Sequence, residues 1–148
     1  MCLVEIIIAT AIVLSICVTL ITISLTYYQT AQSNIQSVKA TYLIEEGLEV
    51  VNFLKTANWD GNIGSLTVGT DYYLAWSTTT RVWATSTTPN TIDNYNRKFK
   101  VEDVNRDGND DIASSGFNDP KTKKVTVTVA WPSSSGTTTK SISAYIMK

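Results

Sequence analysis

The chain of 148 residues contains no histidine, only two cysteines and only three prolines, the first of which is Pro89. It also lacks a Gly-rich phosphate loop and a recognisable nucleophile arrangement, so the common catalytic and nucleotide-binding patterns are missing. We therefore expect a protein that is not an enzyme. The formal net charge of −1 gives no general electrostatic attraction to nucleic acid.

Charge is scarce at the start of the chain, where Glu5 is the only charged side chain before Lys39. It directly precedes a run from Ile6 to Leu25, in which 15 of the 20 residues are apolar and the other five are Thr or Ser. As a helix this run spans about 30 Å, the thickness of the hydrocarbon core of a bilayer. A carboxylate carried to mid-bilayer costs roughly 2.5–3.5 kcal/mol, so Glu5 should have a cationic partner.

The apolar run does not fit a secretory signal peptide, which has a positive n-region, a shorter apolar stretch and a cleavage site of small residues. A plain single-pass anchor stays open. Such anchors take their orientation from flanking Lys or Arg, however, and the first 38 residues contain neither. We expect Met1 to be the first residue of a processed chain that has lost a basic leader, which leaves a free amine close to Glu5.

Residues 1–12, MCLVEIIIATAI, carry a family resemblance. They resemble the mature N-terminus of type IV pilins and pseudopilins, in which a methylated first residue, usually Phe, precedes Thr-Leu-Ile-Glu and a long apolar helix. Here Met1 stands in place of Phe and Cys2 in place of Thr. The Gly and Pro that several pilins have inside this helix are absent from the apolar run.

The resemblance implies a structural subunit, a major pilin, of an extracellular type IV pilus filament that supports adhesion, motility or DNA uptake. The subunit would lie in the inner (cytoplasmic) membrane until the pilus assembly machinery builds it into a homo-oligomeric helical filament, with DNA only as an uptake cargo. Met1 would be N-methylated, and Glu5 would meet a neighbour's N-terminal ammonium and set the register. Two alternatives stay open: a pseudopilin of a secretion system, and a membrane-anchored, calcium-dependent binding module that never polymerises.

Beyond Leu25 an approximately helical period continues, with no firm stop before residues 58–61 (NWDG). We predict one helix of about 55 residues, with residues 1–28 as its membrane and filament-core half and residues 29–58 as an amphipathic half. The predicted apolar face of the second half includes Ala31, Ile35, Val38, Tyr42, Leu48, Val51 and Leu54.

Four hydroxyl residues share one face of the first half of this helix: Ser15, Thr19, Thr22 and Thr26. Small hydroxyl residues let helices approach closely and can bond to a neighbouring helix. They can equally bond to their own backbone four residues earlier, so both interpretations stay open.

Residues 59–148 are Thr-rich and alternate between apolar and polar positions, which predicts a globular antiparallel β domain. Four strands are predicted, at residues 71–76, 96–104, 125–131 and 142–146. The last two should form a hairpin. The Ser- and Thr-rich clusters are expected to be loops, at residues 77–80, 85–88 and 133–139. The predicted fold is α+β and pilin-like, a long N-terminal helix of about 55 residues packed on a four-stranded antiparallel β-sheet.

Residues 103–111, DVNRDGNDD, resemble the opening of an EF-hand calcium loop, with oxygen ligands at positions one, three and five, Gly at six and a carboxylate at nine. The predicted Ca²⁺ ligands are Asp103, Asn105, Asp107, Asn109 and Asp111. The twelfth position is Ser114, and Asp119 can replace the missing carboxylate only if the chain folds back. These residue types are also the preferred turn residues, so a polar turn is the alternative.

Two basic stretches, residues 97–100 and 121–124, predict either a local basic patch or the solvated face and protected edges of strands. The four tryptophans suit core packing as well as ligand binding. Neither feature by itself selects a function.

Overall fold

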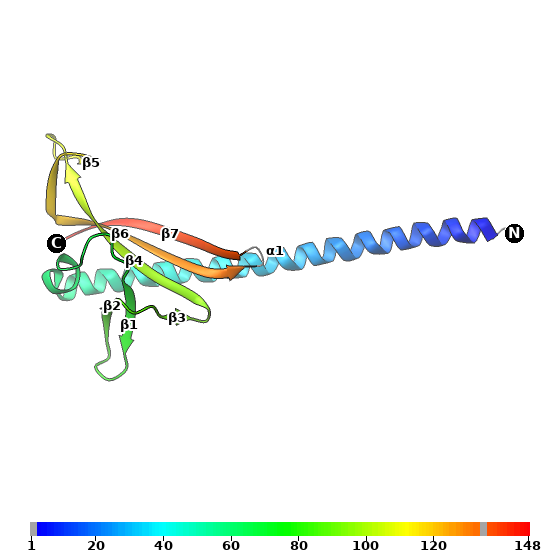
Figure 1. The fold of residues 1–148 in the computed structure, drawn as a ribbon, viewed down its shortest axis with the longest axis horizontal. Helices are drawn as coiled ribbons and strands as arrows, with labels where there is room; N and C mark the ends of the chain where they lie inside the picture. The colour runs from blue at the N-terminus through cyan, green and yellow to red at the C-terminus, as the bar shows by residue number, and fades with distance from the viewer. Residues whose placement is uncertain (1–2, 134–135) are drawn as a thin grey trace. The chain divides into compact units, whose positions relative to one another are not determined.

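The computed structural model describes residues 3–133 and 136–148, drawn in Figure 1. The elements in chain order are α1 (Leu3–Ala57), the π-helical turn η1 (Asp60–Gly64), β1 (Tyr73–Ser77), β2 (Val82–Ser86), β3 (Thr91–Ile92), β4 (Tyr95–Arg106), β5 (Ile112–Ala113), β6 (Phe117–Ser133) and β7 (Gly136–Met147). The chain divides into two compact units, residues 1–38 and 39–148, and α1 contributes to both.

The single long helix is confirmed, because α1 runs for 55 residues without interruption. Its charges suit the helix dipole, with Glu5 in the first turn and Lys55 in the last. At its C-terminal end, the Leu54 carbonyl accepts two hydrogen bonds, one from the backbone amide of Asn58 at 3.1 Å and one from the side-chain amide of Asn62 at 2.9 Å. The helix therefore ends where the Asn58 to Gly61 stretch predicts.

The buried stripe of α1 lies within the second unit and follows spacings of three and one: Ala40, Leu43, Ile44, Gly47, Val50, Val51 and Leu54. The predicted face was therefore only partly right. Val51 and Leu54 are buried, whereas Ile35, Val38 and Tyr42 are exposed. Both the predicted and the observed sets of residues have a helical period. Contact with the sheet decides which set is buried, and the period alone does not reveal this.

The main sheet is antiparallel, with strand order β3-β4-β6-β7 and the short β5 paired to β4. The predicted hairpin is confirmed by the β6–β7 pairing, in which Val127 lies opposite Ile142. Its predicted turn residues 134 and 135 lie outside the described residues. Alternate residues of β4 and β6, such as Phe99 and Val127, are fully buried and form one core with the buried stripe of α1. The α+β prediction, a long helix packed on an antiparallel sheet, is therefore confirmed.

The predicted strand at residues 71–76 needs correction. The strand is β1, and it pairs with β2 in a separate two-stranded sheet, while only an isolated bridge joins Tyr72 to Phe99 of the main sheet. Parts of all three predicted loops belong to strands instead: Ser77 to β1, residues 85–86 to β2, Ser133 to β6 and residues 136–139 to β7. Thr is β-branched and favours strands when a partner strand is available, and this pairing outweighs the loop-like composition.

Gly47 lies where α1 packs closely on the sheet. A Cβ at this position would lie 2.9 Å from Val127 Cγ1 and 3.3 Å from Arg97 Cδ. The glycine lowers helix propensity by up to about 1 kcal/mol, and the close packing explains why it is present. The Val127 side chain is β-branched and fully buried, so it has little freedom to move away.

We expect Gly47→Ala to destabilise the chain by about 1 kcal/mol, because overpacking of 1–3 kcal/mol exceeds the gain in helix propensity. The measurement is the thermal unfolding midpoint of the full chain in detergent. Gly108→Ala is the control, since a Cβ there meets no atom within 4 Å. A Gly47→Ala variant as stable as the parent chain would contradict the expectation.

Candidate functional site

The apolar half of α1 is an exposed hydrophobic surface. Every residue from Leu3 to Ile35 is exposed, including large side chains such as Ile6, Leu14 and Ile21. This part of α1 is long and apolar enough to cross a bilayer. Monomeric soluble proteins rarely leave so large a continuous apolar surface in water, so this helix suggests membrane association or secretion.

Two tyrosines mark the end of the apolar run. Tyr27 and Tyr28 follow Leu25 by two and three residues, and both side chains are largely exposed. Tyrosine is enriched at membrane–water interfaces, where its ring lies among the headgroups. Their position fits an apolar segment that ends near Leu25.

Glu5 lies in the first turn of α1 and is exposed. Within the described part of the chain, no side chain or amine forms a hydrogen bond or ion pair with its carboxylate. Met1 and Cys2 lie outside the described residues. The pairing of Glu5 with an N-terminal amine and the methylation of Met1 therefore stay predictions.

The hydroxyl residues of the apolar half bond to their own helix. Thr19 Oγ1 donates to the Ser15 carbonyl at 2.8 Å, and Thr22 and Thr26 each donate four residues back at 2.9 Å. Ser15 donates to the Ile12 carbonyl at 2.7 Å. Of the two interpretations, the structure has the hydroxyls bonded to their own backbone. The methyl groups of the three threonines therefore add to the apolar surface.

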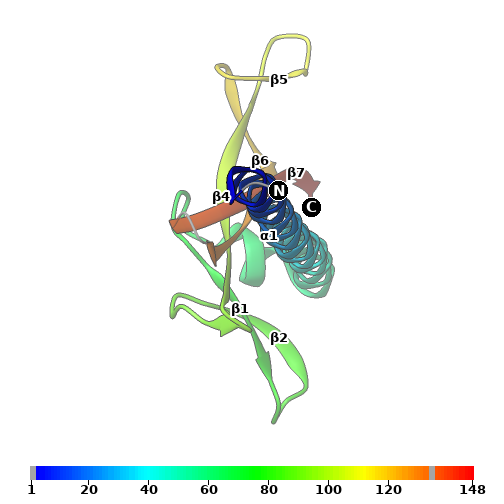
Figure 2. The same ribbon diagram turned by 90° about the vertical axis from the view of Figure 1, so that its right-hand side faces the viewer.

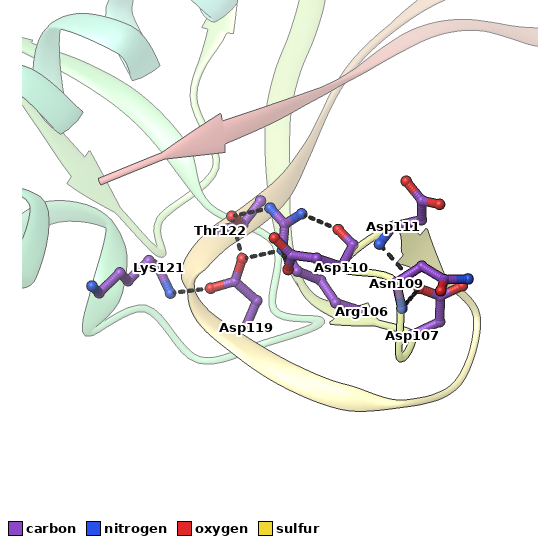
Figure 3. Close-up of polar contacts among 8 residues, drawn as sticks. All are labelled: Arg106, Asp107, Asn109, Asp110, Asp111, Asp119, Lys121 and Thr122. Carbon is purple, nitrogen blue, oxygen red and sulfur yellow. Dashed lines mark hydrogen bonds and ion pairs between the residues drawn. The ribbon is translucent and has the colours of Figure 1, made fainter.

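The residues predicted to bind calcium are divided between a strand and a turn. Asp103 and Asn105 belong to β4, where Asp103 forms an ion pair with Lys123 of β6. In the turn, the Asp107 carboxylate accepts hydrogen bonds from the backbone amides of Asn109 at 2.8 Å and Asp111 at 3.0 Å, as Figure 3 shows. The loop thus closes the β4–β5 pair as a polar turn.

Among residues 3–133 and 136–148, no group of three or more acidic, His or Cys side chains is placed to hold a metal ion. Calcium binding by the loop stays a prediction. If it occurs, millimolar calcium should raise the unfolding temperature of the full chain, because a ligand that binds only the folded state stabilises it. An Asp107→Asn variant, which lacks one of the predicted ligands, is the control. An unfolding temperature of the parent chain that calcium leaves unchanged would exclude the site.

A network around Arg106 was not predicted from the sequence. Its guanidinium donates from Nε to Asp119 at 2.8 Å, from one terminal nitrogen to the Asp110 carbonyl at 2.7 Å, and from the other to Thr122 Oγ1 at 3.4 Å. The chain does fold back, since the start of β6 pairs with the end of β4, but Asp119 meets Arg106 (Figure 3). Only this strand pairing brings the two residues together.

Three donors hold the Asp119 carboxylate in its ionised form. The Thr122 hydroxyl donates at 2.7 Å, followed by Arg106 and the backbone amide of Lys121 at 2.9 Å. These bonds lower the pKa of Asp119 from 3.8 to about 2. A carboxylate with a lowered pKa stabilises the fold above its unfolded-state pKa, and this contribution is lost as the pH falls through the folded-state value.

We therefore expect the unfolding temperature to fall as the pH is lowered from about 4 to about 2, with part of the decrease due to Asp119. Asp119→Asn should lower stability at pH 6 and should weaken this pH dependence. Asp111→Asn is the matched control, because the Asp111 carboxylate accepts no hydrogen bond and forms no ion pair among the described residues. Equal pH profiles for Asp119→Asn and the parent chain would contradict the role of Asp119.

The two basic stretches do not form an unpaired patch. Arg97 is buried and pairs with Glu46, while Lys98 and Lys100 both pair with Asp71. In the second stretch, Lys123 and Lys124 pair with carboxylates of β4. The arrangement corresponds to cross-strand ion pairs on the sheet, one of the two interpretations of these stretches.

No family model, curated protein or solved structure matches the chain. What the structure establishes is a pilin-like architecture, a long helix that is apolar in its N-terminal half and packs on an antiparallel sheet through its C-terminal half.

Proposed function

We propose that the protein is the structural subunit, a major pilin, of an extracellular type IV pilus filament. The observation that carries the proposal is the division of α1 into two parts. Between residues 40 and 54, one stripe of α1 is built into the core of a folded domain, whereas residues 3–25 present an uncovered surface that is mostly apolar. The exposed apolar part of such a helix must be covered by an apolar environment. We propose that lipid covers it first and that the helices of identical subunits cover it in the filament.

The physical basis of assembly is the exchange of lipid contacts for helix–helix contacts. The apolar run has the length to lie in the inner membrane before assembly. In the filament, Glu5 is proposed to pair with a neighbour's N-terminal ammonium and to set the register, because a carboxylate in an apolar surrounding needs a cation. A head-to-tail contact that does not close then gives an open helical polymer.

The functions proposed for the filament are adhesion, motility or DNA uptake through the pilus assembly machinery. DNA enters the proposal only as a cargo. The lysines at 98, 100, 123 and 124 already pair with carboxylates, so the described sheet offers little free positive charge. No catalytic role is part of the proposal.

The test is microscopy of the surface material of cells that produce the chain. We expect negative staining of sheared material to reveal abundant filaments that contain this chain, and mass spectrometry to find a methylated N-terminus. Short or rare filaments would favour the pseudopilin alternative. A chain that stays monomeric in the membrane would overturn the proposal and favour the membrane-anchored binding module.

A further inference from the structure

Among the exposed apolar side chains of residues 39–148, two groups lie on opposite sides of the main sheet. The hairpin patch consists of Trp76 and Val82 on the β1–β2 hairpin together with Phe53 of α1. The ribbon patch consists of Ile112 of β5 and Phe117 of β6. Figures 1 and 2 both show the β1–β2 hairpin and the ribbon around β5 extending from opposite sides of the main sheet.

The hairpin patch contains a depression of about 440 Å³, called here the hairpin hollow. It is lined by Glu49, Val50, Phe53, Trp76, Arg81, Val82 and Trp83. Trp76 packs edge-on against Trp83 of the opposite strand at 5.4 Å between ring centroids, and it remains 50% exposed. Phe53 and Val82 are also about half exposed. The hollow thus has rigid aromatic walls that are only partly used within the chain.

The ribbon patch protrudes. Phe117 is 82% exposed, and Ile112 and Phe117 both lie directly opposite Arg106 in the strand register, which places them on one face. Gly116 lets the chain pass close to β4, since a Cβ there would lie 2.1 Å from the Arg106 carbonyl oxygen. Together with the Arg106–Asp119 ion pair, this close approach fixes the base of the ribbon.

The turns of the two sides carry opposite charges. Arg81 is the only charged residue between Asp71 and Asp93, and its guanidinium forms no hydrogen bond or ion pair with the described residues. Glu49 of α1 also lines the hollow, so the positive charge lies at the hairpin turn and not over the whole hollow. The ribbon turn, residues 107–111, carries three carboxylates and no cation. The Asp110 side chain is 86% exposed; it lies 3.5 Å from Arg106 Nε, which also pairs with Asp119 at 2.8 Å.

We propose that the ribbon patch of one copy docks in the hairpin hollow of the next copy, with Phe117 against Trp76 and the acidic turn beside Arg81. The proposal rests on the proposed filament and assigns the contact between its globular domains. Because the two patches lie on opposite sides of one unit, the contact is head-to-tail, and it gives an open polymer where the rotation between copies does not close a ring, as the proposed filament requires. Trp and Arg are the residues that most often dominate interface energies.

Cross-linking of the full chain tests this contact. In a Cys2→Ser, Cys17→Ser background, Thr79→Cys in the hairpin turn is combined with Ser114→Cys beside the ribbon patch. Treatment of whole cells with a short bis-maleimide should give a ladder of multimers. The matched control combines Thr79→Cys with Ser141→Cys, which lies exposed on β7 and should leave the chain monomeric.

Charge reversal identifies the residues that meet. In the Thr79→Cys, Ser114→Cys chain, Arg81→Asp or Asp110→Lys alone should reduce the ladder, and the two together should restore it. Phe117→Ala should reduce it about tenfold, as expected for an apolar anchor worth more than 1 kcal/mol. All of these positions are exposed, and protease resistance of the 39–148 unit checks that the variants fold.

The outcomes separate the contact from the filament. If microscopy shows filaments but cross-linking gives no ladder, or if the control pair gives an equal ladder, the docking contact is overturned and the proposed filament is not. A ladder without filaments would support the contact and overturn the filament. Absence of both would overturn both.

Discussion

Glu5→Gln is expected to abolish filaments while the chain still accumulates in the membrane. The substitution keeps the shape and polarity of the side chain and removes only its charge. Insertion of the chain into the membrane should be unaffected, because the transfer of a neutral amide into lipid costs less free energy than the transfer of a carboxylate. Docking should fail, because a neutral side chain no longer attracts the ammonium group of a neighbour. The measurements are filament yield after shearing and the amount of chain in the membrane fraction.

The matched control is Glu45→Gln, which changes an exposed carboxylate on the same helix beyond the apolar run. It should leave filament yield unchanged. Normal filaments from Glu5→Gln would refute the assembly role of Glu5, and a loss of chain from the membrane would point instead to a role in insertion.

The features that the sequence predicts well are those with a local cause. The length of α1 follows from a continuous apolar and then periodic pattern with no proline before Pro89. The β6–β7 hairpin follows from the alternation of apolar residues in both strands, which gives β6 one buried face through Val127. On β7 the predicted buried face is only partly right, because Ile146 is buried whereas Ile142 is 39% exposed. These patterns lie within one or two neighbouring segments, so no long-range contact is needed to interpret them.

The features that were missed depend on contacts between distant segments. Residues 71–76 have a strand-like composition, but only the pairing with β2 decides that they lie outside the main sheet. The choice between Ile35 and Ala40 as buried positions depends on where the sheet meets α1. Similarly, Arg106 and Asp119 are 13 residues apart and meet because β6 folds back on β4.

Arg97 is an example of a residue whose role depends on contacts between distant segments. In the sequence it opens a basic stretch, yet its side chain is only 2% exposed, while its partner Glu46 is 45% exposed. Arg97 donates to the Glu46 carboxylate at 2.7 Å and to the Leu43 carbonyl at 3.2 Å, and its guanidinium lies over the Trp83 ring. One of its terminal nitrogens has no hydrogen-bond partner among the described residues. Arg97 therefore joins α1 to β4 and depends on Glu46 for its charge balance.

Removal of the two partners should have unequal effects. Glu46→Ala leaves a buried guanidinium without its counter-charge, and we expect a loss of about 3 kcal/mol in the free energy of unfolding. This corresponds to a fall of roughly 10 °C in the unfolding midpoint for a unit of this size. Arg97→Met keeps most of the apolar stem and leaves a carboxylate that water reaches, so its cost should stay below about 1.5 kcal/mol.

Thermal unfolding of both variants in the full chain measures this difference, with Glu45→Ala as the control for loss of an exposed carboxylate next to Glu46. The informative result is which of the two variants loses more stability. If Arg97→Met proves the more damaging change, packing of the arginine stem against Gly47 and Trp83 dominates over the charge. If neither variant shifts the midpoint, the pair does not hold α1 on the sheet, and the apolar core alone fixes that contact.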